Sequence, residues 1–255
     1  MSPGFESREH FHLLFLARFA QRFAGRKWAV KGGACLRFFH RSARFSEDMD
    51  IDVDPGIPVG TLAKGVEAIL GSRAFLSALS ARGVAELVTS APKQTATVQR
   101  WKAGLGPGRG RAVLPTKLEF SRRRSGMPFM AGVPGGAILS AYSMAPFAAQ
   151  YYGATELAAQ KVAALASESR TAVRDLFDLD HLFANCGPDR EKALRIVGAG
   201  ICGAAARKAR GFGRRDFREE VLPFLSGDLR DAYEAPASFE GLRARVLSAL
   251  SAGLT

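Results

Sequence analysis

Three aspartates at alternate positions are the side chains of this sequence best suited to chemistry. Asp48, Asp50 and Asp52 alternate with apolar residues within 44–53, a pattern that predicts a strand with one polar face. On a strand the three carboxylates would point the same way, in steps of about 7 Å. Clustering them is costly unless a cation neutralises them, and hard oxygen ligands suit Mg²⁺ or Mn²⁺. The alternative is a solvated acidic edge strand.

Two glycines precede the aspartates, where an apolar run passes into a possible helix. The apolar run 28–30 leads into Lys31-Gly32-Gly33, and a helix can resume at Ala34. Glycines at such a turn let backbone N–H groups approach an anion, and a helix N-terminus adds a favourable dipole. A phosphate-binding turn followed by a carboxylate strand is the minimum needed to hold a nucleoside triphosphate and its metal ions.

A further acidic residue, Glu119, lies between two apolar residues on another predicted strand. If that strand lies beside the aspartate strand, Glu119 can join the same site. Two metal ions about 3.5–4 Å apart would there activate a hydroxyl and stabilise the departing pyrophosphate. The alternative is an exposed glutamate paired with Lys117 or Arg122.

The elements that must position these residues follow from the hydrophobic spacing. Helical spacing covers 5–24 and 59–81, and strand patterns fall at 28–30, 49–53, 85–88, 95–101 and 113–121. A glycine-rich tract, 104–110, predicts a hairpin loop. From residue 155 helical spacing continues nearly to the end. We therefore predict an α/β (α+β) fold, with a mixed α/β half over 1–150 and a helical region over 151–255.

One stretch, 125–155, carries no charge and could mimic a membrane span. Three prolines and five glycines interrupt it, and a lipid-exposed backbone so broken would leave polar groups unsatisfied. We interpret it as buried strand and loop and expect no membrane association. The N-terminus lacks the continuous apolar stretch of a secretory signal, so we expect a cytoplasmic protein. Three cysteines without a CxxC pair do not fit a disulfide framework or a structural zinc site.

The net charge of +12 is concentrated in two segments. Residues 100–124 hold eight basic residues against one glutamate, and residues 207–218 hold six against one aspartate. These two segments account for the whole excess. Such concentration favours a polyanionic partner, either nucleic acid or nucleotide phosphate. The alternative is a solubilising surface in an arginine-rich protein.

Five motifs, in order, resemble those of the AbiEii/AbiGii toxin family. These nucleotidyltransferase-like proteins belong to bacterial type IV toxin–antitoxin and abortive-infection systems. The resemblance spans residues 28–183, and its pairing of KGG with RFSEDxD is fairly specific. The motifs are Lys31-Gly32-Gly33-Ala34-Cys35-Leu36, then RFSEDMD at 44–50, Lys117-Leu118-Glu119, ELAAQK at 156–161 and RDLFDL at 174–179.

The resemblance implies a polymerase-β-like nucleotidyltransferase core with a mixed sheet, followed by a helical region that completes the nucleotide site. It places the metal pair on Asp48 and Asp50, and Glu119 would be a further ligand if its strand lies beside theirs. Asp52 is less favoured, although the wider nucleotidyltransferase pattern also fits Asp50 with Asp52. The residues implied to contact the nucleotide are Lys31, Gly32, Gly33, Ser46, Lys161 and Arg174.

The helical motifs supply the remaining implied site residues. Lys161 corresponds to the family's helix lysine, whose ammonium contacts nucleotide phosphates. Arg174, Asp175 and Asp178 lie one turn apart, so they are expected to share a helix face and to orient Lys161 or the substrate. The alternative for these three residues is a surface salt-bridge ladder.

The function expected from these features is a metal-dependent nucleotidyltransferase that uses Mg²⁺ or Mn²⁺ and an NTP. The resemblance makes it a bacterial toxin that transfers a nucleotide to RNA, with tRNA as the leading acceptor, and implies a cognate antitoxin encoded nearby. The basic segments 100–124 and 207–218 would hold the RNA. Two alternatives are transfer to a protein or small molecule, and a non-catalytic basic protein that binds nucleic acid.

Overall fold

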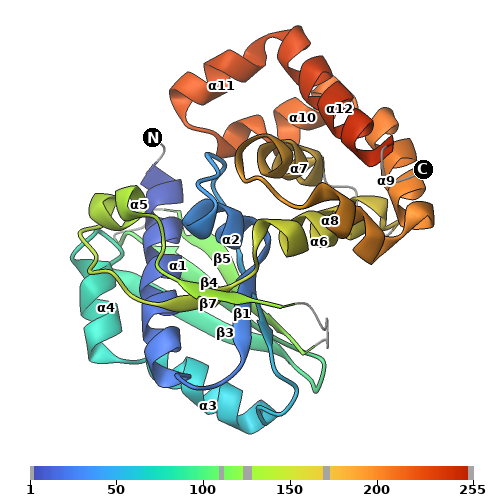
Figure 1. Ribbon diagram of the computed structural model, residues 1–255. Coiled ribbons are helices and arrows are strands. Elements are labelled where there is room, and N and C mark those ends of the chain that lie inside the picture. The colour runs from blue at the N-terminus through green and yellow to red at the C-terminus, as the bar shows by residue number, and fades with distance from the viewer. Residues whose placement is uncertain (1–2, 109–111, 123–127, 169–172, 252–255) are drawn as a thin grey trace. The chain divides into compact units, whose positions relative to one another are not determined.

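The computed structural model describes residues 3–108, 112–122, 128–168 and 173–251 (Figure 1). The chain divides into two compact units. The first, which we call the sheet unit, comprises Met1–Phe39 and Phe45–Tyr151. The second, the helical unit, comprises His40–Arg44 and Tyr152–Thr255. The predicted division at residue 150, into a nucleotidyltransferase core and a helical region that completes the nucleotide site, stays a prediction.

The sheet unit contains a seven-stranded sheet in the order β3-β4-β5-β2-β1-β7-β6. Strands β1 and β2 are antiparallel, whereas β2 pairs in parallel with β5 and β1 with β7. This mixed sheet with its helices confirms the predicted fold class. The strands are β1 (Trp28–Lys31), β2 (Met49–Val53), β3 (Glu86–Gln94), β4 (Val98–Gly106), β5 (Leu114–Ser121), β6 (Met130–Gly132) and β7 (Ala149–Tyr151), and the helices are α1 (Pro3–Arg22), α2 (Gly32–Phe39), α3 (Val59–Leu70), α4 (Arg73–Ser80) and α5 (Gly136–Ala141).

Aromatic side chains join α1 to one face of this sheet. The rings of Phe15 and Phe19 lie 6.3 Å and 5.4 Å from the ring of Phe120 on β5. Phe19 also meets Trp28 of β1 edge-on at 5.1 Å. Burying each phenylalanine contributes about 1.5–3 kcal/mol to the stability of the sheet unit. Because side chains alternate along a strand, the apolar face of β2 turns toward this core and its aspartates occupy the opposite face.

Several sequence-based expectations differ from the structure in extent, among them the helix over 59–81 and the loop over 104–110. The predicted helix over 59–81 is interrupted at Gly71 and Ser72, where the Ser72 hydroxyl accepts a hydrogen bond from the Phe75 N–H (3.3 Å) and starts α4. The tract 104–110 is not all loop, because its first three residues belong to β4. A Cβ at Gly104 would lie 2.7 Å from Val113 Cγ1, so a larger residue there would displace the Val113 side chain. Residues 109–111 lie outside the described residues.

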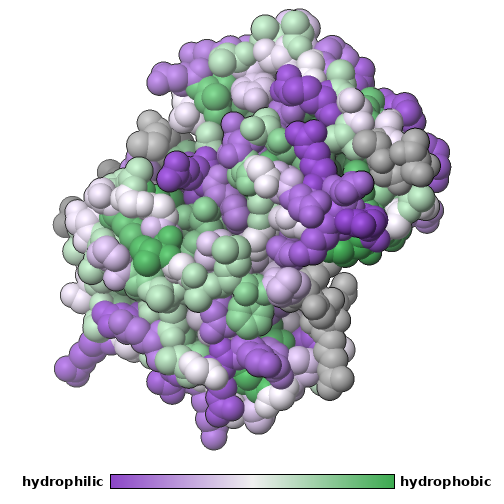
Figure 2. Space-filling view, in the orientation of Figure 1, coloured by the Kyte–Doolittle hydropathy of each residue, from purple (hydrophilic) through white to green (hydrophobic). Residues whose placement is uncertain are grey.

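The expectation of buried strand and loop over 125–155 is right about the strands and wrong about the burial. This stretch contains strands β6 and β7 and a short helix, α5. Met130, on the edge strand β6, and Val133, which follows that strand, are 53% and 52% exposed. Figure 2 shows hydrophobic residues at the surface around α5 and β7. Residues 125–127 lie outside the described part, within which no helix is long and apolar enough to cross a bilayer.

The helical unit confirms the predicted helical second half. The short segment His40–Arg44 belongs to it: a ring nitrogen of His40 is 2.9 Å from the Tyr152 carbonyl oxygen, and one of His181 is 2.8 Å from the His40 carbonyl oxygen. Its helices are α6 (Ala154–Ala166), α7 (Arg174–Asn185), α8 (Arg190–Val197), α9 (Ala199–Gly211), α10 (Arg214–Glu220), α11 (Gly227–Glu234) and α12 (Pro236–Ser251), with a 3₁₀ turn, η1 (Leu222–Phe224).

Candidate active site

Four charged residues form a row across four neighbouring strands of the sheet unit. Lys31 on β1 is the register partner of Asp50 on β2, and Asp50 is the partner of Glu119 on β5. Glu119 is in turn the partner of Arg100 on β4. The row thus runs cation, anion, anion, cation. The expected proximity of Glu119 to the aspartate strand is therefore present.

Basic side chains pair with three of the four carboxylates in this region. Lys117 Nζ lies 2.9 Å from Asp48 Oδ2, and Lys31 Nζ lies 2.5 Å from Asp52 Oδ1. Arg100 lies 2.6 Å from Glu119 Oε2. The cost of clustering carboxylates is thus reduced by Lys31, which was expected at the nucleotide, and by Lys117 and Arg100, for which the sequence predicted no role in the site.

Glu119 is paired, but with neither residue that the alternative interpretation named. Lys117 forms an ion pair with Asp48 instead. Arg122 is buried and donates to the Ile57 carbonyl oxygen and to Gln99 Oε1. The partner of Glu119 comes from β4, opposite it in the register. Sequence spacing does not reveal that pair, because it depends on which strands are neighbours.

Asp50 is the exception among the carboxylates. Within the described residues its carboxylate accepts no hydrogen bond and makes no ion pair. Burial raises the pKa of Asp50 above its ordinary value. Lys31 and Lys117 oppose that shift, whereas Glu119 and Asp48 add to it. The centre of the row is therefore a buried carboxyl group whose ionised form the neighbouring cations stabilise only incompletely.

The glycine turn lies at the same end of β2 as Asp48 and Asp50. Strand β1 is antiparallel to β2, so the residues after Lys31 pass beside the start of β2, whereas Asp52 pairs with Ala29 inside the sheet. Gly32 has a φ of +65°, and a Cβ there would lie 3.0 Å from Asp50 Oδ2. Glycine is therefore required both by the backbone conformation and by the approach of the carboxylate.

The carboxylates fit a divalent cation in chemistry but are not assembled around one. Asp48, Asp50 and Glu119 supply the hard oxygens that Mg²⁺ and Mn²⁺ prefer, and Asp50 has uncompensated charge. In the part of the chain that the structure describes, no three histidine, cysteine or acidic residues form a ready metal site. To bind the cation, Asp48 would have to release its ion pair with Lys117, and Glu119 its ion pair with Arg100.

A second charged cluster lies within the helical unit. Lys161 Nζ on α6 is 2.7 Å from Asp175 Oδ1 and 2.6 Å from Asp178 Oδ2, both on α7. Arg44 holds Asp178 through two hydrogen bonds of 2.9 Å and 2.8 Å. All four residues are buried. The structure thus brings together Lys161, Asp175 and Asp178 as expected, in the core rather than in a surface ladder.

Electrostatics favour the charged forms in this cluster. Burial alone would raise the pKa of Asp178, but Arg44 and Lys161 hold that pKa well below its ordinary value. Burial alone would lower the pKa of Lys161, but Asp178 and Asp175 raise it. Each ionised group therefore depends on its oppositely charged partners.

Two arginines complete the description of this cluster. The guanidinium of Arg174 lies over the ring of Phe224, 5.4 Å from its centre, and its expected contact with the nucleotide stays a prediction. Arg44 was not assigned to the site, yet it supplies the bidentate partner of Asp178. The clue to Arg44 was the balance of charge in the motifs. If Asp175 and Asp178 are both buried, they require a second cation besides Lys161.

The basic segment 207–218 is partly neutralised within the helical unit. Arg215 pairs with Glu219, and Arg218 lies 3.5 Å from Glu234. Arg207 and Arg210 on α9 are exposed and make no ion pair with a described residue. In the segment 100–124, Arg100 and Lys117 are engaged at the acidic row, and Arg109, Arg111, Arg123 and Arg124 lie outside the described residues.

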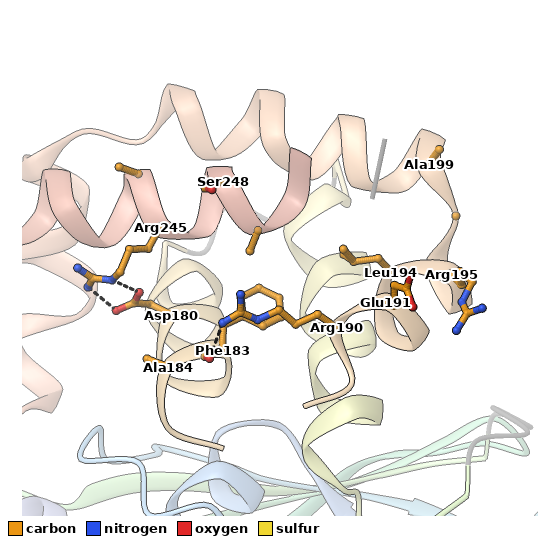
Figure 3. A pocket seen from close by; sticks show the side chains of 13 residues that line it. Asp180, Phe183, Ala184, Arg190, Glu191, Leu194, Arg195, Ala199, Arg245 and Ser248 are labelled. Atoms are coloured by element: carbon orange, nitrogen blue, oxygen red, sulfur yellow. Dashed lines mark hydrogen bonds and ion pairs between the residues drawn. The ribbon is translucent and has the colours of Figure 1, made fainter. Parts of the chain in front are cut away.

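A cavity of about 1130 Å³ opens within the helical unit (Figure 3). Helices α7, α8 and α12 line most of it, with Arg190 donating to the Phe183 carbonyl oxygen. At one end Arg245 of α12 and Asp180 of α7 form a bidentate ion pair (2.7 Å and 2.8 Å). Neither Lys161 nor Asp178 lines this cavity, so it is separate from the buried cluster.

Comparison with known proteins adds a family and a fold. The model of the family described as "Nucleotidyl transferase AbiEii toxin, Type IV TA system" matches residues 14–244. No curated protein matches the sequence. The solved structure of MenT4, a nucleotidyltransferase toxin from Mycobacterium tuberculosis H37Rv, is similar to this chain with a TM-score of 0.62 at 16% identity, over 100% of this chain and 96% of that one. A protein from H. pylori assigned to the nucleotidyltransferases gives a TM-score of 0.51 at 16% identity, over 94% and 95%.

Proposed function

The chain belongs to the AbiEii family of nucleotidyl transferase toxins of type IV toxin–antitoxin systems. From this membership we propose which residues bind the metal ion, the nucleotide and the RNA. The enzyme is a nucleotidyltransferase. We infer that it transfers a nucleotide from an NTP to the 3′ end of an RNA, with tRNA as the preferred acceptor. In such a reaction an acceptor hydroxyl oxygen forms a bond to the α-phosphorus. The bond from that phosphorus to the β-phosphate oxygen breaks, pyrophosphate leaves, and the hydroxyl proton passes to solvent.

The observation that carries this proposal is the uncompensated carboxylate of Asp50, beside Glu119 and the Gly32 turn. We assign Asp48 and Asp50 as the metal pair, with Glu119 as a further ligand. Mg²⁺ or Mn²⁺, when bound there, supplies positive charge against the triphosphate. Asp52 is the weaker choice, because it is buried against Lys31 and lies farther along β2 from the glycine turn.

The other residues are proposed to bind and orient the nucleotide. Backbone N–H groups of Gly32 and Gly33 at the start of α2 would receive phosphate oxygens. Lys31 would add a positive charge at the same turn. The hydroxyl of Ser46 donates to the Asp48 carbonyl oxygen (2.8 Å) and would stabilise the backbone that leads into β2. Each of these groups acts by position and charge, which is how phosphoryl transfer is generally catalysed.

Lys161 is proposed to contribute its charge to the nucleotide phosphates. Asp175 and Asp178 use two of the three donors of its ammonium, which leaves one for a phosphate oxygen. Asp175 and Asp178 would orient the lysine, and Arg44 would keep Asp178 ionised. Arg174 keeps a proposed role in nucleotide binding, although its described contact is with Phe224.

The partners follow from the toxin–antitoxin family. We expect a cognate antitoxin encoded nearby, and we propose a cytoplasmic location, where NTPs and tRNA are present. RNA would bind through the exposed cations of 207–218 and through those of 100–124. Charge neutralisation of RNA phosphates provides affinity that falls with salt.

The experiment supplies the purified full chain with each α-labelled NTP, with Mg²⁺ or Mn²⁺, total tRNA and a mixed protein pool. Label incorporated into tRNA, dependent on the metal and lost in Asp50→Asn, is the expected result. Asp231→Asn, the same carboxylate-to-amide change at an exposed position of the helical unit, serves as the matched control and should leave incorporation unchanged. Label found in the protein pool would refute the RNA acceptor, and label retained by Asp50→Asn would refute the carboxylate assignment.

A further inference from the structure

Helix α1 places two polar side chains, Glu9 and His12, in the interior of the sheet unit. They lie one turn apart and are 4% and 1% exposed. Buried polar groups are costly unless they are hydrogen-bonded, so their partners show what they are for. Each is connected, through one intermediate side chain, to residues 45–48. These residues lie just before β2 and end at Asp48, and we call them the 45–48 turn.

His12 reaches the 45–48 turn through Thr116 of β5. The Thr116 hydroxyl donates to the Glu47 carbonyl oxygen (2.6 Å), so its oxygen is left to accept from His12 (2.7 Å between Nε2 and Oγ1). This direction assigns the proton to Nε2 of the imidazole. Nδ1 of His12 has no hydrogen-bond partner among the described residues, as a neutral ring with one proton allows.

The neutral form agrees with the surroundings of His12. Burial, and secondarily the charge of Arg8, lower the pKa of His12 to about 3. The imidazole therefore stays neutral at physiological pH and can donate from Nε2 alone. His12 is in this way a fixed donor rather than a proton carrier.

Glu9 reaches the other end of the turn through Arg37 of α2. Two hydrogen bonds, 2.5 Å from Nε and 3.1 Å from NH2, join Arg37 to the Glu9 carboxylate, which also accepts from the Tyr142 hydroxyl (2.9 Å). The guanidinium of Arg37 lies over the ring of Phe45, 4.4 Å from its centre. Phe45 is the first residue of the 45–48 turn, so this contact fixes where the turn begins.

We propose that α1 positions Asp48, with His12 and Glu9 as positioning residues that hold the two ends of the 45–48 turn through Thr116 and Arg37. Neither residue touches the substrate. The inference rests on the proposed function, because it takes Asp48 to be a metal ligand. Residues that support metal ligands typically change metal affinity by about 10–100-fold when they are altered.

The test compares Thr116→Val, which keeps the shape and removes the hydroxyl, with Thr116→Ser, which restores it. His10→Phe is the matched control, because His10 is also buried on α1 but stacks on Tyr142 instead of contacting the turn. Each full-length variant is assayed for Mn²⁺ binding by titration calorimetry, without NTP. Amide hydrogen exchange of residues 46–48 is measured in parallel without metal. Asp48→Asn shows whether the measured Mn²⁺ site includes Asp48.

We expect Thr116→Val to weaken Mn²⁺ binding by about tenfold or more and to speed exchange at residues 46–48. Thr116→Ser and His10→Phe should remain within about threefold of the natural protein in both measurements. A folded Thr116→Val with unchanged exchange at residues 46–48 overturns the proposal. If Thr116→Val does not fold, Glu9→Gln takes its place, with faster exchange expected at Phe45 and Ser46 and unchanged exchange again overturning the proposal.

The metal assignment of Asp48 and the role of α1 can be refuted separately. If the natural protein binds Mn²⁺ but Asp48→Asn binds it equally well, the metal assignment of the proposed function fails. Hydrogen exchange then still decides whether α1 holds the turn, because that measurement involves no metal.

Discussion

Asp50 and Glu119 lie directly opposite each other on two parallel strands, β2 and β5. Like charges placed opposite each other in a sheet destabilise it, by about 0.2–1 kcal/mol. Arg100 compensates Glu119, but within the described residues Asp50 has no such partner. The sheet therefore retains a local electrostatic penalty at the position where the proposed reaction needs negative charge.

Replacing Asp50 by asparagine should remove activity and raise stability. At pH 7 the free energy of unfolding should increase by about 0.5 kcal/mol, because the repulsion from Glu119 and Asp48 disappears. The pKa of Asp50 is raised in the folded state, so its ionisation destabilises the protein as the pH rises. The difference between variant and natural protein should therefore vanish as the pH falls through the pKa of Asp50. Urea unfolding at several pH values measures this, and a less stable variant at pH 7 would contradict it.

Replacing Asp178 by asparagine should destabilise the helical unit by about 3 kcal/mol at pH 7, because Arg44 and Lys161 would be left with only one buried aspartate. The pKa of Asp178 is depressed in the folded state, so its contribution is complete above the ordinary aspartate pKa of about 4 and is lost as the pH falls below it. Urea unfolding at pH 7 and pH 3.5 should show the difference shrinking in acid. Asp231→Asn, the same change at an exposed helix position, should cost less than about 0.5 kcal/mol.

Replacing Gly32 by alanine should cost about 1–2 kcal/mol, because an L-residue is strained at its φ of +65°. The added Cβ would also press on Asp50 Oδ2, so nucleotide transfer should fall by more than the loss of folded protein explains. Gly60→Ala is the control, since a Cβ at Gly60 in α3 meets nothing within 4 Å. That change should stabilise the protein by about 0.5 kcal/mol. Thermal unfolding and transfer assays on both variants check this, and full activity in Gly32→Ala would argue against the close approach.

RNA binding should depend on Arg207 and Arg210 more than on Arg215 and Arg218. The first two are exposed on one face of α9 without a described ion pair, whereas the second two are paired with glutamates. Each phosphate contact that is lost should reduce the slope of log affinity against log salt by about one. Filter binding of tRNA at several salt concentrations measures the slope for Arg207→Ala and for Arg215→Ala. Equal slopes would place the RNA elsewhere.

The sequence alone determined the elements whose signals are local. Alternation of apolar and acidic residues predicted β2, and helical spacing predicted α1 and the helical second half, because periodicity reports directly which side of an element is buried. The grouping of Lys161 with Asp175 and Asp178 also followed from the motifs and from helix spacing. Such features depend on residues that are close together in the chain.

Which distant residues compensate the charges depends on how the strands and helices are arranged in the folded protein. Arg100 faces Glu119 because β4 adjoins β5, and Lys117 pairs with Asp48 because β5 adjoins β2. Arg44 reaches Asp178 across 134 positions of sequence. Strand order and helix packing bring these partners together, and no period in the sequence encodes them. The same reason explains why the buried pair on α1, Glu9 and His12, could be connected to Asp48 only after the strands were placed.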